Sequence, residues 1–283
     1  MKIIFATKNY SGLISEVFER VSDFEEFGKI KPAQIIPGLR EIINTFDGQT
    51  KIEANVDGKD ILIIAGSSSE EFMECIDIVE YCFANNCGKI EIVCPFPTWS
   101  KGDGKNTDVA TNRVKILDEL LVYKVHFINP LEHVARLSEN RIFFENHFTT
   151  DLIKSFVDSI GNVVVYLMEE NVWIVNFCKE NGIETFKDGV DVTGKNVILI
   201  SDFIKNGQDW NGVAKNLLED GCTEVNAMIL HCPSIKGNVL DKELFSIVAI
   251  TDSYFNCYDN CKGENAFRLY SISEYICEKI LRI

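Results

Sequence analysis

The chain has 283 residues, of which 46% are hydrophobic and 25% charged, and its net charge at pH 7 is −15. This acidity argues against nucleic acid as a partner, because binding to a phosphate backbone needs clustered lysines and arginines. No apolar run approaches the ~18 residues that a membrane helix needs, and Met1–Ala6 lacks the long apolar region of a signal peptide. The composition therefore predicts a cytoplasmic globular protein that binds neither nucleic acid nor membrane.

The predicted elements of the first half alternate between strands and helices. Lys2–Ala6 is expected to be a strand and Gly12–Val21 a helix. Ile61–Ala65 is continuously apolar and rich in isoleucine, which is typical of a strand buried on both faces of a parallel sheet. A helix is expected next, from a serine near Ser69 to the Asn-Asn-Cys-Gly stop signal that begins at Asn85. Ile90–Cys94 is the following strand.

The second half repeats part of the first. Val56–Ile64 recurs as Val192–Ile200, and each copy precedes a helical stretch and a second strand that ends in Cys-Pro. The remaining expected strands are Phe127-Ile128, Val163–Val165, Val197–Ile200, Glu224–Leu230 and Val248–Thr251, and the remaining helices are Glu169–Asn181, Gly212–Leu218 and Ile272–Leu281. Self-similarity at this distance predicts two copies of one folding unit, and the alternation of strand and helix predicts parallel sheets.

This repeat predicts two domains, 1–147 and 148–283, with the boundary near Phe144–Leu152. Alternatively, the tail from about Ser271 packs back on the first domain.

The ten cysteines are scattered through the strand and helix patterns. In a cytoplasmic chain we expect them to be free thiols that act as small hydrophobic residues. Cys257 and Cys261 are the only close late pair, and no second cysteine or histidine pair stands at zinc-finger spacing. The spacing therefore gives no indication of a structural metal.

Several short motifs then follow one another in a recognisable order. They are Phe46-Asp47-Gly48-Gln49, Asn55–Ile64, Pro95–Lys105, Asp191–Lys195, and His231 with Thr251-Asp252. In this order the chain resembles the ribose-phosphate pyrophosphokinases (phosphoribosyl pyrophosphate synthetases) of nucleotide biosynthesis. The resemblance implies an α/β fold, a tandem duplication of the type I phosphoribosyltransferase fold with two mostly parallel sheets flanked by helices. It also implies a homo-oligomer, or a hetero-oligomer with an active synthetase homologue.

The resemblance implies Mg²⁺ and ATP as cofactors and a nucleotide or sugar phosphate as ligand. The candidate residues are Phe46, Asp47, Trp99, Lys101, Asp103 and Lys105 for the nucleotide, Asp202, Asn206 and Gly207 for the ribose phosphate, His133 for the metal, and His133 with Asp202 for catalysis. Each has a structural alternative: a turn at Phe46-Asp47-Gly48, a solvated Gly-rich loop at 101–105, a surface histidine at 133 and a loop cap at Asp202. His231, just before Cys232-Pro233, is expected to be a buried core histidine.

The family's catalytic motifs are altered at several places. The family's Asp-Leu-His-Ala is Asn129-Pro130-Leu131-Glu132 here, with His133 two places late. The segment Tyr166–Asn171 lacks the glycines of the family's Ser-Pro-Asp-Ala-Gly-Gly, and the four residues between Phe186 and Asp191 are too few for the family's Lys-Arg-Arg hairpin. Phosphoryl transfer depends on such positioning and charge neutralisation.

The phosphate loop differs in charge as well. The family's Asp-Asp-x-x-x-Thr-x-Gly-Thr corresponds to 201–209, where both threonines are missing and Asp209 stands where a phosphate oxygen would arrive. Two unit charges at ~4 Å in an effective dielectric of ~20 repel by roughly 4 kcal/mol. We therefore expect weak binding of ribose 5-phosphate.

Three functions are compatible with this pattern. The leading hypothesis is a catalytically impaired homologue that acts as a regulatory or structural partner or as a nucleotide-binding protein. The alternative is an active Mg²⁺-ATP-dependent ribose-phosphate diphosphokinase that transfers pyrophosphate to ribose 5-phosphate or a related acceptor. A third hypothesis, a phosphoribosyltransferase that uses only the second domain, is disfavoured by Asp209.

Overall fold

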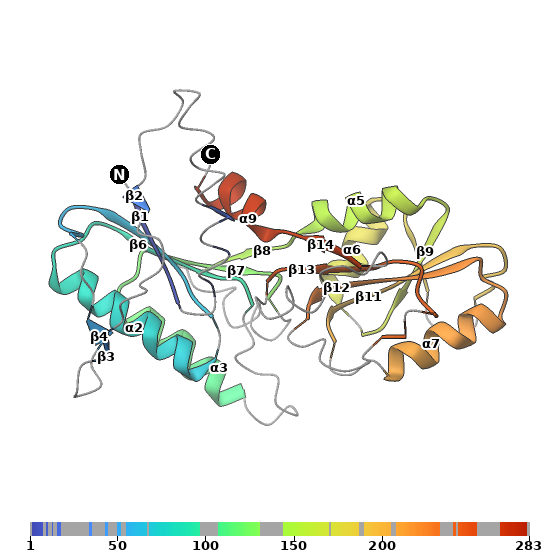
Figure 1. Cartoon of the computed structure of the whole chain (residues 1–283), viewed down its shortest axis with the longest axis horizontal. Helices are drawn as coiled ribbons and strands as arrows, with labels where there is room; N and C mark the ends of the chain where they lie inside the picture. The colour runs from blue at the N-terminus through green and yellow to red at the C-terminus, as the bar shows by residue number, and fades with distance from the viewer. Residues whose placement is uncertain are drawn as a thin grey trace. The chain divides into compact units, whose positions relative to one another are not determined.

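The computed structural model describes residues 2–7, 10, 13, 16–17, 34–35, 43–44, 50–51, 55–66, 68–96, 107–130, 144–169, 171–186, 190–204, 208–232, 240–241, 243–253 and 267–281. The chain divides into two compact units (Figure 1). The first unit comprises Met1–Phe148 together with Ile272–Ile283, and the second comprises Thr149–Ser271. Each unit is built around one six-stranded sheet.

The sheet of the first unit has the strand order β2-β1-β5-β6-β7-β8, and every neighbouring pair is parallel. Its strands are β1 (Lys2–Ala6), β2 (Gln34–Ile35), β5 (Asp60–Ile64), β6 (Ile90–Cys94), β7 (Lys124–Ile128) and β8 (Phe144–His147). The helices of this unit are α2 (Ser69–Ala84), α3 (Thr107–Glu119) and α9 (Ile272–Tyr275), which continues as the π-helical turn η3 (Ile276–Leu281). A separate antiparallel pair consists of β3 (Ile43–Asn44) and β4 (Thr50–Lys51).

The sheet of the second unit has the order β10-β9-β11-β12-β13-β14, again with every neighbouring pair parallel. Its strands are β9 (Val163–Leu167), β10 (Glu184–Phe186), β11 (Asn196–Phe203), β12 (Glu224–His231), β13 (Val248–Thr251) and β14 (Phe267–Tyr270). Its helices are α5 (Thr150–Ile160), α6 (Val172–Glu180) and α7 (Gln208–Glu219).

The two sheets have the same topology, which confirms the predicted duplication. In each sheet the strand that comes first in the chain, β1 or β9, has the second strand in the chain on one side. The other four strands lie on its opposite side, in chain order. The repeated segments Val56–Ile64 and Val192–Ile200 contain β5 and most of β11, the third strand of each order.

A tight turn accounts for the repeated Val-x-Gly-Lys motif. In the first copy Lys59 N donates to Val56 O and Gly58 has a φ of 63°. In the second copy Lys195 N donates to Val192 O and Gly194 has a φ of 71°. A turn with a positive φ at its third position favours glycine, so the same residue recurs in both copies.

The core of each unit lies on both faces of its sheet. In the first unit Ile61 and Ile63 pack on the side of α2 and α3, while Leu62 and Ile64 pack on the opposite side with α9 and η3 (Figure 1). In the second unit α7 covers one face and α5 and α6 cover the other. The continuous apolar runs of β5 and β11 therefore reflect burial on two faces, as predicted.

The C-terminal residues are part of the core of the first unit. Ile272, Ile276 and Ile280 are buried in one cluster with Leu13 and Val17 of the segment predicted as a helix over Gly12–Val21. Within that segment Leu13, Glu16 and Val17 are described, and all three are helical.

The strands at Lys2–Ala6, Ile90–Cys94 and Val248–Thr251 have the predicted bounds. The helix predicted to start at Glu169 begins at Val172 instead, because Asn171 caps it. The predicted helix Gly212–Leu218 extends over Gln208–Glu219. The sequence pattern predicted none of α3, α5, β8, β10 and β14.

The eight cysteines in the described segments are free, as predicted. No helix in those segments is both long and apolar enough to cross a membrane.

Candidate functional site

The carboxyl ends of β9 and β11 mark a natural ligand position in the second unit. The chain passes from β9 to β10 on one side and then returns to place β11 on the other side of β9. Ligands of open parallel sheets bind at such a reversal of strand order, beyond the carboxyl ends of the strands. Asp202 near the end of β11 and Asn171, which follows β9 in the chain, lie at this position.

Asn171 links the two strand ends. Its amide nitrogen Nδ2 donates to Asp202 Oδ2 at 3.1 Å, and its Oδ1 accepts from the backbone nitrogens of Trp173 at 3.2 Å and Ile174 at 3.4 Å. Asn171 is 4% exposed and is the N-cap of α6. The buried side chain of Asn171 thus caps α6 and also holds Asp202, the acid of the family's phosphate-loop motif that this chain retains.

Asp202 is 6% exposed and takes part in contacts within the protein. Besides the bond from Asn171, its Oδ1 lies 3.4 Å from Ser201 Oγ. Ser201 Oγ in turn donates to Phe203 O at 3.0 Å. The Asp202 carboxylate is therefore held by neighbours from two strand ends. A buried carboxylate needs such partners, because removing its water without replacement is costly.

The helix after β11 begins with its own acid. Asp209 lies in the first turn of α7 and is exposed. A carboxylate there interacts favourably with the positive end of the helix dipole, which is the position that would otherwise attract a phosphate. The structure thus places Asp209 at the helix terminus where the sequence predicted charge repulsion.

The ends of β12 and β13 form a second, fully buried polar group. His231 Nδ1 lies 2.8 Å from Ser253 Oγ, and Ser253 Oγ and Thr251 Oγ1 both donate to Leu230 O. His231, Thr251 and Ser253 each have 0% exposure. His231 is therefore a core histidine with a polar partner, as predicted.

The end of β7 carries Asn129 where the resemblance expects an acid. Asn129 is fully buried, has a φ of 45°, and its backbone nitrogen donates to His147 O at 2.7 Å. Asparagine is one of the few residues that adopt this left-handed conformation readily. The residue thus suits the backbone geometry and supplies no negative charge.

The other candidate residues, Phe46, Asp47, Trp99, Lys101, Asp103, Lys105, His133, Asn206 and Gly207, lie outside the described residues.

Comparisons with known proteins agree with the fold. No family model matches the chain. A Streptococcus pyogenes serotype M3 protein named "Putative ribose-phosphate pyrophosphokinase 2" is 26% identical over 98% of this chain and 94% of its own length. The "Ribose-phosphate pyrophosphokinase" of Maricaulis maris is 24% identical over 84% of this chain and 86% of its own length. The chain is thus similar in sequence to ribose-phosphate pyrophosphokinases over most of its length, at 24–26% identity.

A solved structure extends the likeness to the whole fold of this ribose-phosphate pyrophosphokinase homologue. The phosphoribosylpyrophosphate synthetase from Mycobacterium smegmatis superposes with a TM-score of 0.73 at 16% identity, over 99% of this chain and 97% of that one. At this identity the match concerns the fold, which is two parallel sheets flanked by helices.

The Mg²⁺-ATP group that the family uses does not fit the described residues at these strand ends. Mg²⁺ prefers carboxylate oxygens in an octahedral arrangement. Asn129 offers a neutral amide, and the carboxylate of Asp202 already accepts a hydrogen bond from Asn171. At the end of β7 a neutral amide thus stands where an anionic oxygen would hold the ion, and the Asp202 carboxylate is already hydrogen-bonded within the protein.

The family motifs do not reveal two features of the structure, one in the second unit and one in the first. Asn171 was noted in the sequence only as part of a segment that had lost its glycines, although an asparagine before an apolar helical run is a recognisable N-cap signal. A further group of three side chains in the first unit, His126, Glu145 and His147, lies within ligand distance of one another. None of the three was a candidate.

Proposed function

We propose that this chain is a catalytically impaired ribose-phosphate pyrophosphokinase homologue, which acts as a structural or regulatory partner and retains a nucleotide site in its first unit. The hydrogen bond from Asn171 Nδ2 to Asp202 Oδ2 is the observation that carries the proposal. It closes the strand ends at which a sugar phosphate would be expected to bind.

Charge supports the same conclusion. A sugar phosphate and the Asp209 carboxylate would compete for the amino end of α7, and the described residues at the end of β7 supply no acid for the metal. Transfer of a pyrophosphoryl group requires both positioning and neutralisation of charge, so the loss of either lowers the rate by orders of magnitude.

The proposed nucleotide site comprises Trp99, Lys101, Asp103 and Lys105 in the first unit. Lys101 and Lys105 would contact phosphates and Trp99 the base, as the resemblance implies. Thermal shift with ATP, ADP and AMP tests this part, because a ligand at 100 times its dissociation constant adds about 2.7 kcal/mol to stability. Lys101→Ala and Lys105→Ala should reduce the shift, while Lys154→Ala, at an exposed surface ion pair in the second unit, should leave it unchanged.

The catalytic part of the proposal is tested by following AMP release from Mg²⁺-ATP and ribose 5-phosphate. The Maricaulis maris relative serves as a reference under the same conditions. We expect no release above the background of the reaction without protein. Turnover at a rate comparable to the reference would show that the chain is an active diphosphokinase.

The partner role has its own experiment. Light scattering coupled to size-exclusion chromatography gives the mass of the chain alone and after mixing with an intact synthetase from the same source. A mixed complex with altered synthetase activity supports a regulatory partner. A chain that neither joins the synthetase nor changes its activity contradicts that role.

A further inference from the structure

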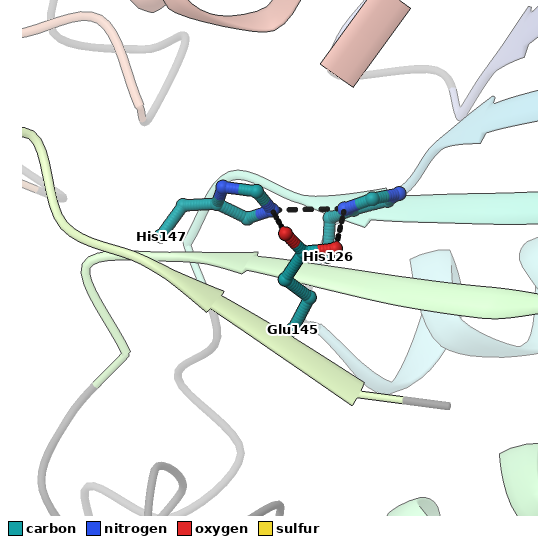
Figure 2. Close-up of side chains that lie close together, drawn as sticks. All are labelled: His126, Glu145 and His147. Carbon is teal, nitrogen blue, oxygen red and sulfur yellow. Dashed lines mark hydrogen bonds and ion pairs between the residues drawn. The ribbon is translucent and has the colours of Figure 1, made fainter. Parts of the chain in front are cut away.

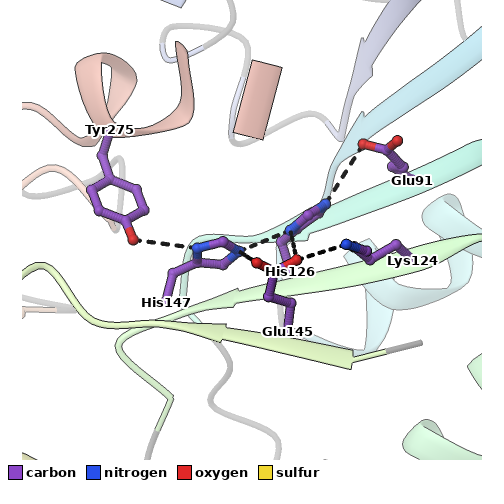
Figure 3. A network of polar contacts seen from close by, with 6 residues as sticks. All are labelled: Glu91, Lys124, His126, Glu145, His147 and Tyr275. Atoms are coloured by element: carbon purple, nitrogen blue, oxygen red, sulfur yellow. Dashed lines mark hydrogen bonds and ion pairs between the residues drawn. The ribbon is translucent and has the colours of Figure 1, made fainter. Parts of the chain in front are cut away.

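A stripe of polar side chains crosses the first sheet on one of its two faces. Glu91 on β6, His126 on β7, and Glu145 and His147 on β8 belong to this stripe (Figure 3). β7 and β8 are parallel, and in their register His126 pairs with Glu145 and Ile128 with His147. Glu145 and His147 are two residues apart on β8, so all three ligand-type side chains lie on one face.

The three side chains converge on one point. His126 Nδ1 lies 2.8 Å from His147 Nε2 and 3.8 Å from Glu145 Oε2, and His147 Nε2 lies 4.0 Å from Glu145 Oε1 (Figure 2). One ligand atom from each residue falls within 4.8 Å of the other two. Two imidazole nitrogens and one carboxylate are the ligands that catalytic zinc sites often use, with a fourth position left for water.

We infer that His126, Glu145 and His147 form a binding site for a divalent transition metal ion, Zn²⁺ before others. Imidazole ligands select zinc and its neighbours over Mg²⁺ and Ca²⁺, which prefer oxygen. The site lies within the first unit and is independent of the proposed function.

The second nitrogen of each histidine faces a polar side chain, and outer groups of this kind orient metal ligands. His126 Nε2 is buried, has no hydrogen-bond partner and lies 3.6 Å from Glu91 Oε2. His147 Nδ1 lies 3.3 Å from the hydroxyl of Tyr275 on α9. These contacts leave His126 Nδ1 and His147 Nε2 directed toward each other and toward Glu145 (Figure 3).

The surroundings of two of the three side chains, His147 and Glu145, favour their deprotonated forms. Burial lowers the pKa of His147 to about 4, with a further contribution from His126, so this imidazole is neutral at pH 7. The hydrogen bond from Lys124 Nζ to Glu145 Oε2, at 2.8 Å, lowers the pKa of Glu145, so the carboxylate is charged. Deprotonated ligands bind a metal without first releasing a proton.

Access and geometry are also suitable. The Glu145 side chain is 46% exposed, whereas those of His126 and His147 are buried, so an ion can reach the histidines past the carboxylate. Two nitrogens bound to a tetrahedral zinc ion are about 3.3 Å apart. The 2.8 Å contact therefore needs to open by roughly 0.5 Å, with the ion replacing the hydrogen bond between the histidines.

Titration of the full chain, stripped with a chelator, tests the site with Zn²⁺ by calorimetry and with Co²⁺ by visible absorption. We expect one ion per chain, and a Co²⁺ spectrum with nitrogen and oxygen ligands and without the near-ultraviolet band of thiolate ligation. Glu145→Gln and His147→Gln should each weaken Zn²⁺ binding at least 10-fold. Glu91→Gln should weaken it about 10-fold, since outer partners typically contribute that much.

The matched control is Glu184→Gln. Like Glu145, Glu184 lies on a sheet-edge strand and pairs with a lysine, with Lys195 Nζ at 3.0 Å. The Glu184→Gln substitution should therefore leave Zn²⁺ binding unchanged. His133→Ala distinguishes the site from the one predicted by the resemblance. Melting curves of every variant in the presence of chelator separate a binding defect from a folding defect. The Co²⁺ spectrum of the wild-type chain tests the ligand set even if a variant fails to fold.

Three outcomes would overturn the inference: no ion bound by the wild-type chain, binding that Glu145→Gln and His147→Gln leave intact, or a Co²⁺ spectrum dominated by thiolate ligands. Loss of binding in His133→Ala with retention in His147→Gln would place the ion elsewhere.

Discussion

Asn171 Nδ2 donates a hydrogen bond to Asp202 Oδ2 at 3.1 Å, joining two residues that are 31 positions apart in the chain. The bond connects the helix cap that follows β9 with the carboxyl end of β11. It satisfies a buried carboxylate from inside the protein. The acid that corresponds to one in the family's phosphate-loop motif is thus hydrogen-bonded within the protein.

Asn171→Ala should destabilise the chain by about 2–4 kcal/mol. The variant loses an N-cap, which contributes about 1 kcal/mol, and leaves a buried carboxylate short of a partner, which costs about 1–3 kcal/mol. Urea unfolding of wild type and variant measures the difference in the free energy of unfolding.

Asn181→Ala is the control for this prediction, because Asn181 is the C-cap of the same helix and its side chain donates only to Phe177 O. We expect a loss below about 1 kcal/mol. An Asn171→Ala variant as stable as the Asn181→Ala variant would show that the link between Asn171 and Asp202 has no structural role.

Gly194→Ala should destabilise the second unit by about 1–2 kcal/mol. Gly194 has a φ of 71°, and an added Cβ would meet nothing within 4 Å, so the cost comes from the left-handed backbone alone. Gly212→Ala is the control, since this helical glycine also has open space and alanine favours the helix by about 0.5–1 kcal/mol. Thermal unfolding of both variants gives the comparison, and equal effects of the same sign would contradict it.

Alkaline pH should destabilise the chain through its buried thiols. Burial raises the pKa of Cys75 from 9.0 to about 12. Between these values the unfolded chain loses the thiol proton and the folded chain keeps it, so stability falls as pH rises. Between pH 8.5 and 10.5 we expect wild type to lose about 2 kcal/mol more than Cys75→Ala.

Cys87→Ala is the control for this pH dependence, because Cys87 is only partly buried and its pKa is raised less. Urea unfolding at each pH measures the slopes. If Cys75→Ala and Cys87→Ala flatten the slope equally, burial of the Cys75 thiol is not its cause.

Lys124→Met should strengthen Zn²⁺ binding several-fold. Lys124 Nζ holds Glu145 Oε2 at 2.8 Å and places a positive charge beside the proposed ion. Methionine keeps much of the apolar stem and removes that charge, which frees the carboxylate. Calorimetric titration compares the two affinities, and weaker binding by Lys124→Met would indicate that the lysine positions Glu145 for the metal.

The scaffold was predictable because its signals are local. The apolar run Ile61–Ala65 and its repeat in Val192–Ile200 predicted strands buried on both faces, and the structure confirms them. β8 was missed because three of the four residues in Phe-Glu-Asn-His are polar, so the segment does not resemble a strand of a parallel sheet. β8 lies at the edge of the sheet, and its Glu145 and His147 belong to the polar stripe.

The site was less predictable because its contacts depend on strand pairing. Asn171 and Asp202 meet only because β9 and β11 are neighbours, and no sequence spacing shows this. His126 and His147 are 21 residues apart and become neighbours through the β7–β8 register. Two histidines and an alternating glutamate on strand-like segments were the available signal, but zinc-finger spacing does not detect ligands brought together by a sheet.

The most direct test of the central claim is ³¹P NMR of the full chain at concentrations comparable to those of Mg²⁺-ATP and ribose 5-phosphate, because even a single turnover is then visible. If the chain is catalytically impaired as proposed, the ATP and ribose 5-phosphate resonances will persist unchanged. The appearance of AMP together with a sugar pyrophosphate would show that the chain transfers pyrophosphate, and would contradict the impaired state inferred from Asn171 and Asp202.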